Sequence, residues 1–485
     1  MLHRPTVEDD RQTVNAHLRR ARDIVSGPIV RAARSDVGAH RNHGFWRPSA
    51  ERTGGQSPQT GAIVEQTQRA LSDQISLSAR SVSEVVVYLL YSGLVQHAGE
   101  RLCHLNRLWA LDKAGLNCCA VTMEPRSVLQ SPELAARIEE AKRASPRTDI
   151  IPQERHFSRV PPGLLRAVGH QRVAAVVFTQ SQAAVAAWRL KRQFAAPAVW
   201  DCRGFVHERA ILSRTVMQKA KDALGAFSEA IAARVADHAF CVCDAMRGEL
   251  VSRLGMKRET ISVLHNSTDT FRFRPDAAAR QAVRSELGLG DQLVFVFSGA
   301  ALPWHCLRET ADFVAQVRSC RADAHLLVLS TDLPRARSEV GQSRLDPAAA
   351  TLLSVSYLEV PRYLAAADCG LLLTAPTPGM DTCSPMKFSE YLAVGLPLVI
   401  GPVVGDYTRW VKEEGLGVVC DPYRPEEWPH RVQELLAAIA DPGITERCRR
   451  IARERLDLAS HVSLIANALR SARCRTTGGN ELRSH

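Results

Sequence analysis

Residues 383–402 read CSPMKFSEYLAVGLPLVIGP, an apolar stretch that is interrupted by a serine, a lysine and a glutamate. Ser384 is a preferred helix N-cap and Pro385 suits the first position of a helix, so we expect a helix over residues 385–394. The turn at Gly395 ends that helix, and the apolar run LPLVIGP that follows has the length of a buried strand. The stretch therefore predicts a helix, a tight turn and a strand, which are the repeating parts of an α/β fold.

Two polar side chains of this helix have a chemistry that an ordinary core helix does not need. Lys387 stands in the first turn, where the helix dipole disfavours a cation unless an anion is shared with it. Glu390 follows three residues later on nearly the same face, where a carboxylate is well suited to accept hydrogen bonds from a ribose diol. Because a helix N-terminus also offers free N–H groups to a phosphate, the pattern is compatible with a nucleotide site. Taken alone, the two residues favour the alternative of a surface ion pair, worth about 0.3 to 0.5 kcal/mol.

Strands and helices alternate on both sides of this stretch. We expect strands from residue 85, after the turn at Gly115, and at 172–180, 196–202 and 238–244. A short strand comes before the turn residues within 261–275, and further strands are expected at 292–300, 324–331, 368–375 and 396–402. Such alternation is typical of mainly parallel sheets that are covered by helices on both faces. The fold class is therefore expected to be α/β, with two doubly wound, Rossmann-like domains that face one another across a cleft.

The pattern divides the chain into four segments. Residues 1–80 are rich in Arg, Ser, Gln and Gly without sustained periodicity, so we expect a flexible extension. Residues 84–270 form the first domain and 271–440 the second, and residues 441–485 form a terminal helical segment and tail.

Composition narrows the cellular setting. The 485 residues include 62 Lys+Arg against 51 Asp+Glu, and the net charge of +11 favours anionic partners, including a membrane surface. The arginines are spread along the chain without a compact basic and aromatic module, which argues against nucleic acid. The thirteen cysteines have no regular spacing, and the sequence shows neither an apolar run of about 18 to 20 residues nor an apolar signal core. These features indicate a cytoplasmic protein, also suited to the inner face of the membrane.

The string SPMKFSEYLAVGLPLVI resembles the nucleotide-sugar-binding segment of retaining glycosyltransferases of the family 4 type (glycosyl transferases group 1), which often carry Ser-Pro-x-Lys-x-x-Glu-Tyr-x-Ala-x-Gly-x-Pro. Two further segments are similar to that family: ISVLHNSTDTFRFRP at 261–275, through Asn266, Asp269, Phe273 and Pro275, and YLEVPRYLAAADCGLLL at 357–373. With WDCRG and AFCVCDAMRGEL in the first half, the resemblance covers about residues 84–440.

The resemblance implies the two-domain GT-B architecture, with the nucleotide sugar held mainly by the second domain and the acceptor by the first. Glu390 would bind the ribose hydroxyls, and the start of the helix at Ser384 would face the diphosphate. Carried over residue by residue, the catalytic candidates are Lys387, Arg308 and Asp381, and the donor-binding candidates are Gly99, Ser298, Gly299, His305, Ser384, Pro385 and Glu390.

Two departures from the family pattern concern the diphosphate and the sugar. Ala300 and His305 stand where many members have an arginine and a lysine, so the balancing charge would come from His305, Arg308 or Lys387. Counting back from Glu390 places Thr382, beside Asp381, where the first of the family's paired glutamates belongs. Whether Asp381 contacts the donor sugar stays open.

The first domain supplies the acceptor-side candidates. Ala98-Gly99 takes the place of the family's Gly-Gly turn, which lets backbone approach a ligand closely. Asp201, Arg203 and Glu208 follow the end of an expected strand, where ligand-binding residues of open α/β sheets gather. The alternative for each is a structural role, such as an ion pair within a loop.

The resemblance implies metal-independent transfer of a sugar, with retention of configuration, from a nucleoside diphosphate sugar to a hydroxyl of a glycan or lipid-linked acceptor. No cofactor is expected, since the nucleotide sugar is a substrate. Two alternatives remain: a GT-B-like nucleotide-sugar epimerase, and a non-catalytic subunit that binds a partner transferase, which the missing glutamate and the altered basic pair favour.

Overall fold

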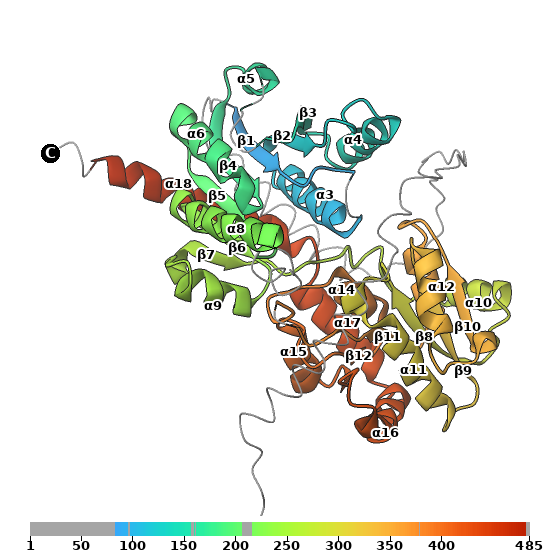
Figure 1. The fold of residues 1–485 in the computed structure, drawn as a ribbon. Helices are drawn as coiled ribbons and strands as arrows, with labels where there is room; N and C mark the ends of the chain where they lie inside the picture. Colours follow the sequence, from blue (N-terminus) through green and yellow to red (C-terminus); the bar gives the residue numbers. More distant parts are fainter. Residues whose placement is uncertain are drawn as a thin grey trace, which may run out of the picture. The chain divides into compact units, whose positions relative to one another are not determined.

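Two all-parallel β-sheets organise the protein in its computed structural model (Figure 1). The structure describes residues 83–95, 98–156, 160, 162–205, 216–377 and 379–481. The expectation for residues 1–80 therefore lies outside the described residues, as does Glu208. Residues 84–485 form one compact unit.

The first sheet has seven strands in the order β3-β2-β1-β4-β5-β6-β7. The strands are β1 (Glu84–Leu90), β2 (Asn117–Glu124), β3 (Thr148–Glu154), β4 (Arg172–Thr179), β5 (Ala198–Asp201), β6 (His238–Cys241) and β7 (Ile261–Val263). The order reverses between β1 and β4, which pair directly, so loops that leave these two strands turn to opposite sides. Such a switch point is where open α/β sheets bind ligands.

Helices cover both faces of the first sheet. They are α3 (Ala98–Lys113), α4 (Pro132–Ala144), α5 (Pro162–Val168), α6 (Ala184–Phe194), α8 (Val216–Val235) and α9 (Asp244–Ser252). Alternate residues of β1 point to opposite faces: Val85, Val87 and Leu89 enter one apolar cluster, and Val86, Tyr88 and Leu90 enter the other. Burial on both faces explains why the strand sequence is continuously apolar instead of alternating.

The second sheet repeats this plan with six strands in the order β10-β9-β8-β11-β12-β13. The strands are β8 (Leu293–Ser298), β9 (Ala324–Leu329), β10 (Ala350–Leu353), β11 (Cys369–Leu372), β12 (Leu398–Ile400) and β13 (Gly417–Val419). The helices are α10 (Ala277–Glu286), α11 (Leu307–Arg318), α12 (Leu333–Gly341), α13 (Val360–Leu364), α14 (Met386–Val394), α15 (Tyr407–Glu414), α16 (Trp428–Ala440) and α17 (Ile444–Arg455). Here the order reverses between β8 and β11, the strands that precede the two candidate donor loops.

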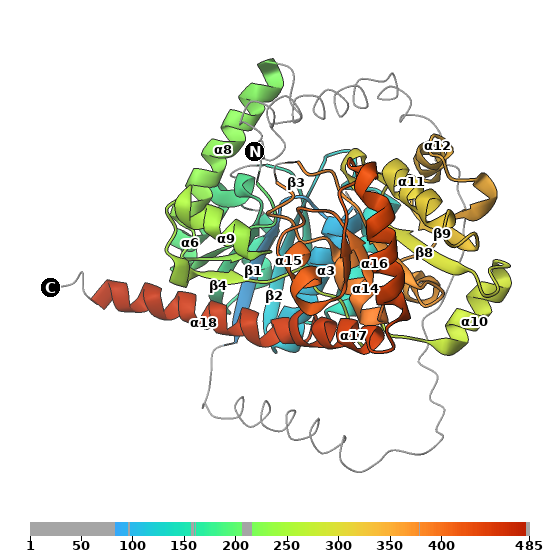
Figure 2. The ribbon, with the colours of Figure 1, turned by 90° about the horizontal axis from the view of Figure 1, so that it is seen from below.

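The last helix, α18 (Ser460–Glu481), returns to the first sheet. Ile465, Ala468, Leu469 and Ala472 enter the same apolar cluster as Val86 of β1. Figure 2 shows α17, which packs in the second domain against α14, followed directly by α18. The terminal segment thus contributes to both domains.

The expected fold class, two doubly wound parallel sheets, is confirmed. Three strands that the sequence pattern did not predict are β3, β10 and β13. Two of them have only three or four residues, and β3 contains Pro152, which an edge strand tolerates because one side of its backbone needs no sheet partner. Among the described residues, no helix is long and apolar enough to cross a membrane.

Candidate functional site

Helix α14 lies where the second sheet changes direction. It packs closely over β11 because Gly370 has no side chain: a Cβ there would lie 2.4 Å from the Tyr391 ring. The Tyr391 hydroxyl accepts a hydrogen bond of 2.8 Å from the N–H of Ser298, at the end of β8. Gly395, with φ of 89°, ends the helix as expected. These contacts fix α14 against both strands at the switch point.

The beginning of this helix differs from the sequence prediction. Pro385 is the N-cap and α14 starts at Met386, so the interpretation of Ser384 as the cap is wrong. The Ser384 hydroxyl instead accepts the N–H of Asn266 at 2.9 Å and bonds the Tyr407 hydroxyl at 2.6 Å. The serine is occupied by tertiary contacts, and the first N–H groups of α14 keep no side-chain cap. That arrangement is consistent with an anion-binding helix end.

Lys387 is buried, with 8% of its surface exposed. Its Nζ lies 4.2 Å from the ring centroid of Phe297 in β8, and no described residue offers it a hydrogen bond or an ion pair. Burial lowers the pKa of Lys387 to about 8, although Glu390 raises it in part. A desolvated cation without a partner is costly, so this position favours an anionic ligand.

Glu390 is also buried, with 5% exposed. Its Oε1 accepts a hydrogen bond of 3.0 Å from the Tyr357 hydroxyl. Burial raises the pKa of Glu390 to about 7, against the effects of Tyr357, Lys387 and Arg272. The alternative of a surface ion pair between Lys387 and Glu390 is wrong, because both side chains are buried and no ion pair joins them.

The loop after β8 approaches Lys387 at Gly299. A Cβ there would lie 3.2 Å from the lysine Nζ, and the φ of 130° disfavours other residues. In the short helix η4 (Pro303–His305), His305 Nδ1 donates to the carbonyl of Ala300 at 2.6 Å, since a carbonyl can only accept. Burial and Lys387 lower the pKa of His305 to about 3. The imidazole is neutral at neutral pH without a ligand. Its contact with a diphosphate stays a prediction.

Two of the three catalytic candidates are exposed. Arg308, in the first turn of α11, has no ion-pair partner among the described residues. Asp381 lies in the loop before α14, and its backbone carbonyl contacts the Cys243 thiol at 3.5 Å. Thr382, at the position of the missing glutamate, is buried and donates to the carbonyl of Gly379 at 3.1 Å. No carboxylate therefore occupies that position.

In the first sheet, Asp201 ends β5 inside a cluster of charged side chains. Its Oδ2 accepts from the Tyr88 hydroxyl at 2.5 Å and from Arg203 at 2.6 Å, and Arg107 lies 3.5 Å away. Although burial raises the pKa of Asp201, the two arginines hold it well below its usual range. Asp201 and Arg203 thus form the ion pair that was the alternative to a ligand contact, and contact with an acceptor stays a prediction.

Helix α3 completes this cluster with a residue that the sequence reasoning missed. His104 Nδ1 accepts from Arg203 at 3.1 Å, so its Nε2 donates to the Ser92 hydroxyl at 2.8 Å. Burial and the positive charge of Arg203 lower the pKa of His104 to about 3. Gly99 lies in the first turn of α3, where a Cβ would meet nothing within 4 Å. No contact of its own therefore requires glycine there.

The segment between β7 and β8 connects the two groups of candidate residues. Asn266 Nδ2 donates to the carbonyl of Ser384 at 2.6 Å, and its Oδ1 accepts from the Cys103 thiol of α3 at 3.4 Å. One residue earlier, His265 Nε2 bonds Asp406 at 2.7 Å. One residue later, Ser267 bonds His461 of α18 at 2.8 Å. Hydrogen bonds thus tie the start of α14 to α3 and α18.

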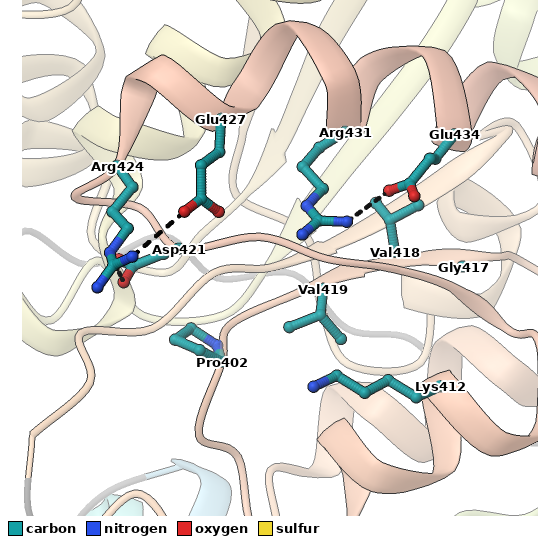
Figure 3. A pocket seen from close by; sticks show the side chains of 10 residues that line it. All are labelled: Pro402, Lys412, Gly417, Val418, Val419, Asp421, Arg424, Glu427, Arg431 and Glu434. Atoms are coloured by element: carbon teal, nitrogen blue, oxygen red, sulfur yellow. Dashed lines mark hydrogen bonds and ion pairs between the residues drawn. The ribbon is translucent and has the colours of Figure 1, made fainter. Parts of the chain in front are cut away.

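A hollow of about 680 Å³ lies between β13, α15 and α16, and none of the candidate residues lines it (Figure 3). Arg424 pairs with Glu427 and Arg431 with Glu434 along its wall. Because these charges neutralise one another, the hollow is a poor site for a diphosphate. Among the described residues, no group of three or more His, Cys, Asp or Glu side chains is arranged to hold a metal ion.

One protein-family model matches part of the chain. Residues 99–267 match the model of the glycosyl transferase 4-like domain. No curated protein sequence matches the chain significantly.

Solved structures share the fold at low identity. A sucrose-phosphate synthase from Thermosynechococcus elongatus has a TM-score of 0.61 and 16% identity, over 80% of this chain and 100% of that one. Alr3699/HepE from Anabaena, in complex with UDP and glucose, has a TM-score of 0.58 and 14% identity, over 80% and 99%. WaaG, a glycosyltransferase involved in lipopolysaccharide biosynthesis, has a TM-score of 0.53 and 14% identity, over 79% and 99%.

Proposed function

We propose that this protein, a GT-B-fold chain that carries a glycosyl transferase 4-like domain, transfers a sugar from a nucleoside diphosphate sugar to a hydroxyl acceptor with retention of configuration. The observation that carries the proposal is Lys387, which is buried beside the end of β8, one helical turn from the buried Glu390, and has no ion-pair partner among the described residues. A buried cation matches the diphosphate of a nucleoside diphosphate, and a buried carboxylate matches its ribose hydroxyls.

The nucleotide is bound through its ribose and its phosphates. Glu390 accepts hydrogen bonds from the ribose hydroxyls, while the uncapped start of α14 and Lys387 contact the diphosphate. Gly299 lets the loop after β8 pass close to Lys387, because a Cβ there would lie only 3.2 Å from the lysine Nζ. UDP sugars are the first candidates, since the structurally similar Anabaena protein is in complex with UDP and with UDP-glucose.

In the transfer step, the bond between the anomeric carbon and the phosphate oxygen breaks, and a bond to the acceptor oxygen forms on the same face of the sugar. The proton of the acceptor hydroxyl moves to the leaving phosphate. Lys387 and Arg308 stabilise the charge that develops on the diphosphate, which is where preorganised cations lower the barrier most. Asp381 is the candidate contact to the sugar, and the reaction uses no metal ion.

The acceptor is proposed to be a glycan or a lipid-linked glycan precursor on the side of the first sheet. Asp201 and Arg203 lie at the carboxyl end of β5, where ligand-binding groups of parallel sheets gather. The net charge of +11 suits an acceptor that is carried on a lipid phosphate at a membrane surface. Similarity to a lipopolysaccharide glycosyltransferase is consistent with a glycan product.

Thr382 favours a second candidate function. Its hydroxyl is turned to the carbonyl of Gly379, where family members place a glutamate. A chain that holds a nucleotide sugar without that carboxylate fits a non-catalytic subunit that binds a partner transferase.

Nucleotide binding and turnover separate these functions. Purified protein is titrated with UDP, GDP, ADP and their common sugar conjugates, alongside Glu390→Ala. Saturable binding of one nucleotide that weakens by about 1 to 3 kcal/mol in the variant supports the donor site. Transfer or slow hydrolysis of the sugar supports the transferase, and binding without chemistry supports the subunit. A folded protein that binds no nucleotide would refute the donor site.

A further inference from the structure

Tyr357 lies in the loop between β10 and α13 and is held from the interdomain segment. The Arg272 guanidinium lies 4.8 Å from its ring centroid and donates to its backbone carbonyl at 2.6 Å. The Phe273 ring lies 5.9 Å away, centroid to centroid. With contacts on its ring and its backbone, the tyrosine has a defined orientation and its hydroxyl has a defined position.

That position is at the carboxylate of Glu390. The Tyr357 hydroxyl donates to Oε1 at 3.0 Å, and this is the one hydrogen bond that the Glu390 side chain makes within the described part of the chain. Burial and the neighbouring carboxylate raise the pKa of Tyr357 well above its usual value. The phenol therefore keeps its proton and always donates. One carboxylate oxygen is occupied, and Oε2 is left for a ligand.

We propose that Tyr357 is a positioning residue of the donor site: its hydroxyl holds one oxygen of Glu390 and directs the other to the ribose diol of the nucleotide. This inference rests on the proposed function, since it assigns a task to a second residue of the same site. Tyr357 would act through Glu390 and would not touch the reacting atoms.

The hydroxyl also favours the ionised carboxylate. The groups that face Glu390 are Lys387 on its own helix, and Tyr357 and Arg272 from other elements. Burial opposes ionisation, and the pKa of about 7 leaves protonated and ionised forms in comparable amounts at neutral pH. Removing one hydrogen bond to the charged form moves that balance further toward the protonated carboxyl, which accepts fewer hydrogen bonds from a diol.

The test compares Tyr357→Phe with Tyr363→Phe. Tyr363 of α13 makes the same kind of bond, from its hydroxyl to Oε1 of Glu286 at 3.1 Å, but it does not contact Glu390. Binding of UDP and of 2′-deoxy-UDP is measured by calorimetry from pH 5.5 to 8.5 for the wild type and both variants. We expect Tyr357→Phe to weaken UDP binding about tenfold at pH 7. We also expect the pH at which half of the UDP affinity is lost on acidification to rise by about one pH unit.

The comparison of ligands shows whether the effect passes through the diol. The preference of the wild type for UDP over 2′-deoxy-UDP should shrink in Tyr357→Phe and persist in Tyr363→Phe. An unchanged pH midpoint and an unchanged preference overturn the inference while the proposed function stands. Equal losses in both variants also overturn it, because they indicate general loosening of the α13 region. If the wild type binds no nucleotide, both the inference and the donor site fail.

Discussion

Replacing Lys387 with methionine should stabilise the protein and abolish its affinity for a nucleoside diphosphate. The side chain is 8% exposed and has no anionic partner among the described residues, so the folded state carries the cost of a desolvated ammonium group. Methionine has a similar length and can fill the same space without a charge. A gain in stability with a loss of binding is the signature of a residue that is retained for a ligand.

The magnitude follows from the pKa of Lys387. A lowering from 10.5 to about 8 corresponds to about 3 kcal/mol, at about 1.36 kcal/mol for each pH unit. Methionine forfeits the contact of the ammonium with the Phe297 ring, worth about 1 to 2 kcal/mol when desolvated. The net gain at pH 7 is then about 1 to 2 kcal/mol, or roughly 1 to 2 °C in Tm for a folded unit of this size.

The pH dependence gives the sharper test. Below pH 8 the lysine is charged in both states, so the folded protein carries the full cost. Between pH 8 and 10.5 the folded protein loses the proton while the unfolded chain keeps it, and the cost disappears. The advantage of Lys387→Met should therefore be largest at pH 7 and fade toward pH 10.

Thermal and urea denaturation of both proteins from pH 6.5 to 10, with and without UDP, measure these effects. Lys412→Met is the matched control, because Lys412 is an exposed lysine of α15 and its removal should change little. A less stable Lys387→Met at pH 7, or a gain that stays constant up to pH 10, would refute the reasoning. UDP should stabilise the wild type and the control but not Lys387→Met.

Three further changes test other parts of the structure. Gly299→Ala should reduce both stability and UDP affinity, since the new methyl group contacts Lys387 and the φ of 130° is strained for alanine. In Gly99→Ala the new methyl group contacts nothing, so this variant should stabilise α3 by about 0.5 to 1 kcal/mol. A loss of turnover in Gly99→Ala would therefore support the predicted ligand contact of Gly99. Asp201→Asn leaves two arginines uncompensated inside the first domain and should destabilise the protein by about 3 to 5 kcal/mol in urea; a change below 1 kcal/mol contradicts the ion-pair cluster. Asn266→Ala removes the donor to the segment before α14 and should cost about 1 to 2 kcal/mol and weaken UDP binding, and unchanged binding would show that α14 needs no such support.

The candidate site was predicted in part from sequence. Lys387 and Glu390 are identifiable as candidates because they interrupt an apolar helix. The structure shows why such an interruption is informative: both side chains are buried. The partners of these residues could not be predicted in the same way. Tyr357 lies 33 positions before Glu390, and nothing in its own neighbourhood in the chain indicates that its hydroxyl reaches that carboxylate.

For Ser384, a clear local signal led to a wrong prediction. A serine before a proline is a good local signal for an N-cap, yet contacts from Asn266 and Tyr407, distant in the chain, occupy its hydroxyl. The lowered pKa of His305 could not be predicted for a related reason, since burial and Lys387 lower it, whereas an exposed histidine can carry a charge near neutral pH. The local preferences of a residue describe a side chain that is surrounded by water. In the folded protein, tertiary contacts take the place of that water and change which hydrogen bonds the side chain makes.

The sequence by itself determined the architecture, because secondary structure depends on short-range periodicity: continuous apolar strands that alternate with helices require parallel sheets with both faces covered. It also predicted a nucleotide site at the start of α14. Only the tertiary structure decided which charges are paired, which are buried and alone, and that α18 returns to cover the first sheet. These properties depend on neighbours that are far apart in the chain, and burial, which shifts the pKa of Lys387 and of Glu390, exists only after those neighbours have met.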